Sequence, residues 1–409
     1  MSFQEILPLG DGLQRVLTIG WCVSALSMEV ASVRYRALLP LLALEATHHR
    51  SQLFRPADCV DLDALDVLIL VKTFDLRSLE LAYACKARNI PVIIDLCDNV
   101  LVEGYGRNKL LAHFLDIAKL ATAMVVTTES LAQFIRARLP HQVIHVIPDG
   151  LLTDALAAKG SQTIAAATLA AQSSKKPVRR PRKSFNARLK SLLALLRGTH
   201  RPARKRAQLD QPQALACSSG HAPPGAKKLL WFGNPGASYA RFGLLDLVDI
   251  RDALETIARE FPVELIVVSD HQGKYAQHIA PMAIASRYLQ WSNAVVEYCL
   301  AEADVVLIPN SLDPFSISKS ANRSVYALDH GVPVVATPTP ALVPLAGCIA
   351  LDGFVAGLRR YLSDPQAGAT DVANARQLID NHYDEKVIGR LWNGVLQGIV
   401  APDGSCRRI

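Results

Sequence analysis

The chain has 409 residues, of which 50% are hydrophobic and only 6% aromatic, and its formal net charge is +7. This length allows two or three domains with sizeable cores, and the composition excludes a wholly disordered chain and favours an α/β protein. Eight cysteines without a CxxC pair indicate reduced, mostly buried thiols of a cytoplasmic protein rather than a zinc framework. The first 15 residues lack a basic start and an apolar core, and no apolar run approaches about 20 residues, so we expect neither a signal peptide nor a membrane span.

Apolar strands alternate with helical segments over the first 150 residues. We expect strands at 15–23, 66–71, 90–95, 123–128 and 142–150, and helices at 32–46, 76–89, 107–120 and 129–139. Near-continuous apolar strands separated by helices predict a parallel sheet that is buried on both faces. This pattern places a first α/β domain at residues 1–154.

Residues 155–226 interrupt the alternation. Between Ala155 and Leu209 there is no Asp or Glu, and the formal charge is +14, which leaves −7 on the rest of the chain. A segment rich in Ala, Ser, Pro, Lys and Arg predicts a mostly disordered insert. Within it, the apolar residues of 183–198 fall on one helical face, which predicts an amphipathic helix.

A basic amphipathic helix in a polybasic segment is typical of a protein that lies on an anionic membrane surface. We therefore expect residues 175–206 to bind such a surface, which would make the protein peripheral on the inner face of the membrane. A solvated linker is the alternative. Nucleic acid is a less favoured partner because no aromatic residues are interleaved with the basic ones.

The alternation resumes at Lys227. Strands are expected at 227–234, 263–270, 304–310 and 332–337, and helices at 244–261, 292–303 and 319–330. This pattern predicts a second α/β domain at residues 227–370. The tail at 371–409 is expected to form C-terminal helices that pack back on the first domain.

In an open parallel sheet, ligands bind beyond the carboxyl ends of the strands. In the segment WFGNPGASYARFG, glycines allow backbone N–H groups to approach an anion, and an arginine adds charge. The candidate binding residues here are Gly233, Asn234, Gly236 and Arg241. An ordinary tight turn is the alternative, and the spacing is not that of a GxGxxG dinucleotide fingerprint.

The segment after VLIPN carries a stronger signal. Lys319, Asn322 and Arg323 occupy the first turn of the predicted helix at 319–330, although positive charge opposes the helix dipole there. Together with uncapped N–H groups, a lysine, an amide and an arginine fork predict a phosphate site. Hydroxyls at Ser316, Ser318 and Ser320 would add donors or a cap. Ion pairs with surface carboxylates such as Asp313 are the alternative.

Taken together, DVVLIPN, DPFS and KSANRSVYALDHGVPVVAT resemble the donor-binding half of retaining glycosyltransferases with the GT-B fold. The segments ASVRYRALLP, PVIIDLCDN, AMVVTTESL and VIHVIPDGL resemble parts of the N-terminal half of that family. The resemblance covers almost the whole chain except residues 155–226. It implies an α/β protein with two Rossmann-like parallel-sheet domains that face a cleft, and a basic insert between them.

The resemblance implies a glycosyltransferase that takes its sugar from a nucleotide-diphosphate sugar and gives it to an acceptor that the sequence does not identify. The donor would bind the C-terminal half, with Lys319 and Arg323 stabilising the leaving diphosphate, and Asp313 would be among the donor-binding residues. It also implies no bound metal, and the nucleotide-sugar is a substrate rather than a cofactor. A lipid-linked or cell-envelope acceptor would suit the predicted membrane contact.

Two glutamates that many retaining members carry eight residues apart are not found at the matching positions. Alignment on GVPVV places Tyr326 at the second position, alignment on DPFS places Asp313 at the first, and no glutamate occurs from 303 to 384. Two further hypotheses therefore stay open. One is a nucleotide-sugar epimerase or hydrolase on the same fold, and the other is a non-catalytic module that binds a phosphorylated sugar or a partner.

Candidate acceptor-side residues lie in the N-terminal half. Asp95 and Asp98 could orient an acceptor hydroxyl or act as a base, although Asp95 could simply end its strand. Arg34 and Arg36 could hold an acceptor phosphate or form surface ion pairs. His113 could face the cleft or be a structural histidine of its helix.

Overall fold

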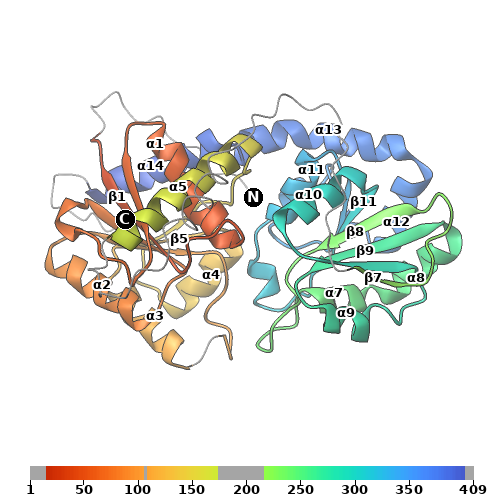
Figure 1. Ribbon diagram of the computed structural model, residues 1–409, viewed down its shortest axis with the longest axis horizontal. Helices are drawn as coiled ribbons and strands as arrows, with labels where there is room; N and C mark the ends of the chain where they lie inside the picture. The colour runs from red at the N-terminus through yellow and green to blue at the C-terminus, as the bar shows by residue number, and fades with distance from the viewer. Residues whose placement is uncertain (1–14, 106–107, 174–215, 401–409) are drawn as a thin grey trace, which may run out of the picture.

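The computed structural model describes residues 15–105, 108–173 and 216–400. It forms two α/β halves that lie side by side, each built on a six-stranded sheet (Figure 1). Most of the basic segment, including the amphipathic helix expected at 183–198 and the membrane contact expected at 175–206, lies outside the described residues.

The sheet of the N-terminal half is parallel throughout and has the order β2-β1-β3-β4-β5-β6. The three central strands β3, β4 and β5 are buried along their whole length, as their apolar sequences predict. The strands are β1 (Thr18–Val23), β2 (Arg50–Phe54), β3 (Val67–Val71), β4 (Val92–Leu96), β5 (Ala123–Val126) and β6 (Ile144–Val146).

Helices cover both faces of this sheet. On one face they enclose a core around Trp21, and on the other a core around Phe114. The helical elements are the π-helical turn η1 (Val33–Leu38), α1 (Leu39–Glu45), the 3-10 turn η2 (Leu62–Ala64), α2 (Leu76–Ala87), α3 (Asn108–Leu120), α4 (Glu129–Arg138) and α5 (Asp154–Ser173).

The sheet of the C-terminal half has the order β12-β11-β8-β9-β10-β7, and only its edge strand β7 is antiparallel. The strands are β7 (Ala216–Ser219), β8 (Lys227–Phe232), β9 (Val263–Ser269), β10 (Ser286–Gln290), β11 (Val305–Ile308) and β12 (Val334–Ala336). The helical elements up to the tail are α7 (Leu244–Asp249), α8 (Arg251–Glu260), α9 (Gln272–His278), α10 (Asn293–Glu302), η3 (Ser316–Ser318), α11 (Asn322–Asp329), η4 (Val343–Leu345) and α12 (Phe354–Ser363).

The last two helices connect the halves. α13 (Pro365–His382) packs on α11 and α12 of the C-terminal half, and α14 (Glu385–Val400) returns to the N-terminal half and packs against α1 (Figure 1). Trp392 of α14 lies edge-on to Trp21 of β1 with ring centroids 5.2 Å apart, and both side chains are fully buried. The tail therefore completes the core of the first half.

Several local expectations were wrong. Residues 155–173, expected to be disordered, belong to the 20-residue helix α5, and 216–219 form the edge strand β7. Alanine is the strongest helix former, so the composition that indicated an insert also suits a helix. β2 and β10 were not predicted, because their sequences RSQLF and SRYLQ mix polar and apolar residues.

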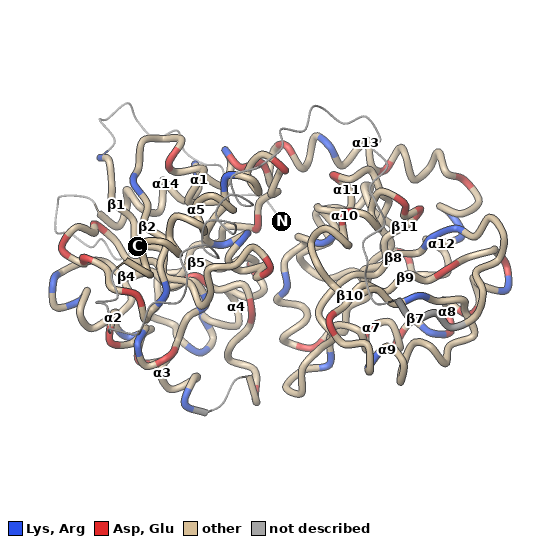
Figure 2. Tube along the Cα trace, viewed as in Figure 1, with Lys and Arg blue, Asp and Glu red and all other residues tan. Residues whose placement is uncertain are grey.

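None of the helices in the described part of the chain is both long enough and apolar enough to span a bilayer. Acidic and basic residues are interspersed over both halves (Figure 2).

We predict that the contact of α14 with the first half is a main source of stability. Leu396 is fully buried in this contact, whereas Leu169 of α5 is 56% exposed. Leu396→Ala should lower the free energy of unfolding by about 2–5 kcal/mol, and the matched control Leu169→Ala by less than about 1 kcal/mol. Urea denaturation followed by circular dichroism measures both. Equal losses would show that α14 does not complete the core.

Candidate functional site

A cavity of about 420 Å³ lies between the two halves. Its lining comes mainly from the segments that follow β1, β3, β4 and β6 in the first half and β8, β9, β10, β11 and β12 in the second. This is the edge at which ligands bind in parallel α/β sheets. The cationic side chains that line it are Arg34, Arg36, Lys72, Lys319 and Arg323.

Arg36 is held by a buried ion pair with Asp95. Its Nε and Nη2 donate to the two carboxylate oxygens of Asp95 at 3.0 and 2.7 Å, and Nη1 donates to the carbonyl of Ile147 at 2.8 Å. The two side chains are 1% and 0% exposed. Asp95 was expected to meet an acceptor hydroxyl and Arg36 an acceptor phosphate. Burial and mutual pairing contradict both expectations, and the pair instead ties η1 to β4.

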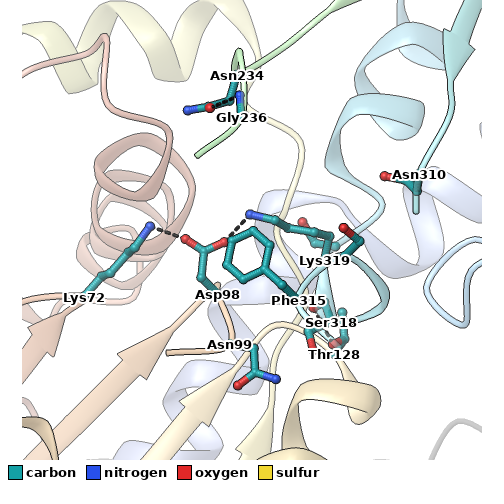
Figure 3. A network of polar contacts seen from close by, with 12 residues as sticks. Lys72, Asp98, Asn99, Thr128, Asn234, Gly236, Asn310, Phe315, Ser318 and Lys319 are labelled. Carbon is teal, nitrogen blue, oxygen red and sulfur yellow. Dashed lines mark hydrogen bonds and ion pairs between the residues drawn. The ribbon is translucent and has the colours of Figure 1, made fainter. Parts of the chain in front are cut away.

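Asp98 lies between two lysines. Its carboxylate accepts from Nζ of Lys72, which follows β3, and from Nζ of Lys319, which belongs to the other half (Figure 3). Burial opposes ionisation of Asp98, but the two ammonium groups outweigh it and hold the pKa of this carboxyl well below its usual range. Asp98 is therefore a carboxylate at neutral pH. Lys319 pairs with Asp98 and not with Asp313.

Lys319 does not belong to the helix that follows it. Lys319 follows the turn η3 with extended backbone, and α11 begins at Asn322. The expectation that Lys319 lies in the first turn of the helix was therefore wrong. The side chains of Lys319, Ser320, Asn322 and Arg323 nevertheless line the same cavity. Ala321, the N-cap of α11, provides no side-chain cap, so the N–H groups of this end stay available for an anion.

Arg323 carries the charge at this helix end. Its Nη1 donates to the carbonyl of Phe232 at 3.2 Å and its Nη2 to Oδ1 of Asn310 at 3.4 Å. Burial lowers the pKa of the guanidinium, and the negative charge of Asp246 opposes this shift. Within the described ranges, no carboxylate forms a salt bridge with Arg323. An arginine held by neutral acceptors is suited to an anionic ligand.

The glycine-containing loop after β8 is folded tightly against the segment after β11. Gly243 has φ +81°, and a Cβ at this position would lie 2.2 Å from the carbonyl oxygen of Asn234. Asp246 joins the two segments by accepting from the backbone N–H of Gly243 at 2.7 Å and that of Ser311 at 3.1 Å. Gly233, Asn234 and Gly243 line the cavity, whereas Gly236 does not.

Three of the expected donor-binding residues have other roles. The guanidinium of Arg241 is exposed and pairs with Asp249. Asp313 accepts from the N–H groups of Phe315 and Ser316 at 2.8 and 3.1 Å, which caps η3. Ser318 is fully buried, with its hydroxyl on the carbonyl of Pro314 at 2.7 Å. None of the three lines the 420 Å³ cavity, whereas Ser316 does. Arg241 and Asp313 line a second cavity between the halves, of about 670 Å³.

On the acceptor side, Arg34 lines the cavity and His113 does not. The guanidinium of Arg34 donates to the carbonyl of Met28 and lies 5.9 Å from the ring centroid of Trp291 in the other half. His113 is half-buried on α3 and is not among the residues that line this cavity.

Several residues of the cavity were not predicted from the sequence, and most of them follow the carboxyl end of a strand. They include Lys72 after β3, Asp149 after β6, Asp270 after β9, Trp291 after β10 and Thr339 after β12. A search of every strand end, rather than of the most conspicuous motifs, would have found them. No group of three or more metal-ligating side chains occurs in the part of the chain that the structure covers.

We predict a pH-dependent contribution of Asp246. Burial raises the pKa of this carboxyl to about 6, and its backbone hydrogen bonds and Arg323 oppose the shift. A raised pKa stabilises the fold below the ordinary pKa of the group, and this stabilisation is lost as pH rises through 6. Between pH 5 and pH 7, wild type should lose about 1 kcal/mol of unfolding free energy relative to Asp246→Asn. Urea denaturation at each pH measures the free energy of unfolding of both proteins. If the difference between them is the same at pH 5 and pH 7, the prediction is wrong.

No protein-family model matches the chain, and neither does any curated protein. Among solved structures, Anabaena Alr3699/HepE in complex with UDP-glucose is similar with a TM-score of 0.56 and 14% identity over 93% of this chain and 99% of that chain. The same protein with UDP gives a TM-score of 0.55 over 94% and 100%. TarM gives 0.50 at 12% identity, over 81% of this chain and 54% of that one. The two facing parallel-sheet halves and these similarities show that the chain has the GT-B fold, as its motifs implied.

Proposed function

We propose that the protein is a glycosyltransferase that moves a sugar from a nucleoside-diphosphate sugar to an acceptor hydroxyl. The observation that carries this proposal is the cavity at the carboxyl edge of both sheets, where the uncapped start of α11 and Arg323 meet. HepE, which shares the fold, was crystallised with UDP-glucose and with UDP, so a uridine nucleotide is the first donor to test.

In this proposal the diphosphate lies at the N-terminus of α11. Arg323 offers a guanidinium held by neutral acceptors, Asn322 an amide, and Ser320 a hydroxyl, and all three line the cavity. Lys319 lines the same cavity and joins them in this proposal. Helix N–H groups and cationic side chains together are suited to a diphosphate.

The chemistry follows from this placement. The bond between the anomeric carbon and the phosphate oxygen breaks, and its electron pair leaves with the diphosphate. Arg323 and Lys319 stabilise this negative charge as it develops, which lowers the barrier. Asp98, ionised in the cavity, accepts the hydrogen bond of the acceptor hydroxyl. As the acceptor oxygen forms the new bond to the anomeric carbon, its proton passes to Asp98, which then releases it to solvent. The stabilisation by side chains suits a metal-independent reaction.

A non-catalytic nucleotide-binding module is the second candidate. It is favoured by the residues at the two positions where many retaining members carry glutamates. Asp313 accepts from backbone N–H groups at the start of η3 and does not line the cavity with Arg323, and Tyr326 lines that cavity without a carboxylate. Such a module would bind the nucleotide sugar without turnover.

An epimerase or hydrolase would convert the donor without an acceptor.

The acceptor and the place of action are further proposals. We propose an acceptor at the cell envelope, reached from the cytoplasmic side of the membrane through residues 175–206, because their charge suits anionic lipid. These residues lie outside the described ranges, so this proposal depends on the sequence alone.

We predict that the two cations contribute to nucleotide binding. Lys319→Ala and Arg323→Ala should each weaken UDP binding by about 1.5–3 kcal/mol, or roughly 10- to 150-fold in Kd, since each removes a charge-assisted contact. Isothermal titration calorimetry measures Kd, and a thermal-shift screen of other nucleoside diphosphates precedes it if UDP does not bind wild type.

Lys227→Ala and Arg359→Ala are matched controls, because both side chains form exposed ion pairs elsewhere in the same half. The controls should bind UDP as wild type does. If both cavity variants fold and bind UDP with unchanged affinity, the diphosphate does not bind at this site.

A further inference from the structure

Lys72 has no role in the function proposed above, although its side chain lines the cavity. It follows directly on β3, and its Nζ contacts Oδ2 of Asp98 while Lys319 contacts Oδ1 from the other half (Figure 3). The side chains of Lys72 and Lys319 are 30% and 34% exposed, and that of Asp98 is 10% exposed. One largely buried carboxylate thus contacts two ammonium groups.

The backbone of Lys72 is held in an unusual conformation. Its φ of +51° lies in the left-handed region, which a residue with a Cβ rarely adopts. Its N–H donates to the carbonyl of Asp95 at 3.0 Å, which continues the pairing between β3 and β4. Such strain concentrates where a side chain must be aimed at a particular point. Here the aimed group is the ammonium that contacts Asp98.

The two lysines differ in their freedom to leave Asp98. Both lysines line the cavity, but Lys319 lies in the segment that precedes α11, where the diphosphate is proposed to bind. Lys72 belongs to the same half as Asp98 and extends from the neighbouring strand. A diphosphate would therefore compete with Asp98 for Lys319, and Lys72 would remain as the cation of Asp98.

We propose that Lys72 is a positioning residue that keeps Asp98 ionised and oriented when Lys319 moves from Asp98 to the diphosphate of the donor. This inference rests on the proposed function. Donor binding then exchanges one ion contact of Lys319 for another, without leaving a buried carboxylate unpaired, which would be unfavourable. Asp98 stays an acceptor for the hydroxyl of the second substrate.

The other titratable groups near Asp98 do not change charge between pH 5.5 and 8. Burial raises the pKa of Cys97 to about 12, and it raises those of Tyr105 and Tyr239 above their ordinary values. Asp98 itself is therefore the group whose protonation a loss of Lys72 would change. The charged and titratable groups that face it are Lys72, Lys319, Cys97, Tyr105 and Tyr239.

The test is the Kd of UDP for wild type and Lys72→Met at pH 5.5 and pH 8, by isothermal titration calorimetry. In Lys72→Met, Asp98 would have no cation once Lys319 has moved to the diphosphate of UDP. Asp98 would then take up a proton when UDP binds, so that binding weakens as pH rises. The ratio of the variant Kd to the wild-type Kd should be at least about fivefold larger at pH 8 than at pH 5.5. Taking the ratio removes the titration of UDP itself.

Two further variants separate this role from a structural one. In an Asp98→Asn background, Lys72→Met should no longer have a pH-dependent effect, because the titrating group is gone. Lys119→Met, which removes an exposed lysine paired with Asp116 on α3, should bind UDP as wild type does at both pH values.

A ratio that is the same at both pH values, in a folded Lys72→Met protein, would overturn the inference and leave the proposed function in place. A pH-dependent ratio that persists in the Asp98→Asn background would also overturn it. If wild type binds neither UDP nor any other nucleoside diphosphate, the proposed function fails and the inference fails with it.

Discussion

The contact of Asp98 with Lys319 joins the two halves at the cavity, and the geometry of the site depends on it. Asp98 follows β4 and Lys319 precedes α11, so this ion contact fixes the edge of one sheet against the edge of the other. Neighbouring hydrogen bonds act in the same direction. Oγ1 of Thr128 donates to the carbonyl of Ser318 at 3.0 Å, and Oγ of Ser320 donates to Asp149 at 2.5 Å.

The charges around the cavity fall into two groups with different consequences. Arg36 is satisfied by Asp95 inside the protein, so it contributes to the shape of the site and not to its affinity. Arg323 has only neutral acceptors, and Lys319 shares its carboxylate with Lys72. Arg323 and Lys319 belong to the C-terminal half, where the donor is placed, and Arg34 is the cation of the N-terminal half whose polar partner is the carbonyl of Met28.

The sequence predicted the central strands because strands buried on both faces, such as β3 and β4, are continuous apolar runs. It did not predict β2, an edge strand of mixed polarity, or α5, whose composition also suits disorder. The local pattern at 319–323 placed Lys319 and Arg323 in one cavity. It could not predict the partner of Lys319, because Asp98 lies 221 positions away in the chain. It also could not show that Asp95 forms a buried ion pair with Arg36.

The measurement that tests the central claim most directly is a crystal structure of the protein with UDP. We expect the diphosphate at the N-terminus of α11, within hydrogen-bond distance of the guanidinium of Arg323, and Nζ of Lys319 moved from Asp98 to a phosphate oxygen. A nucleotide that binds elsewhere, or a bound diphosphate with no contact to Arg323, would contradict the account.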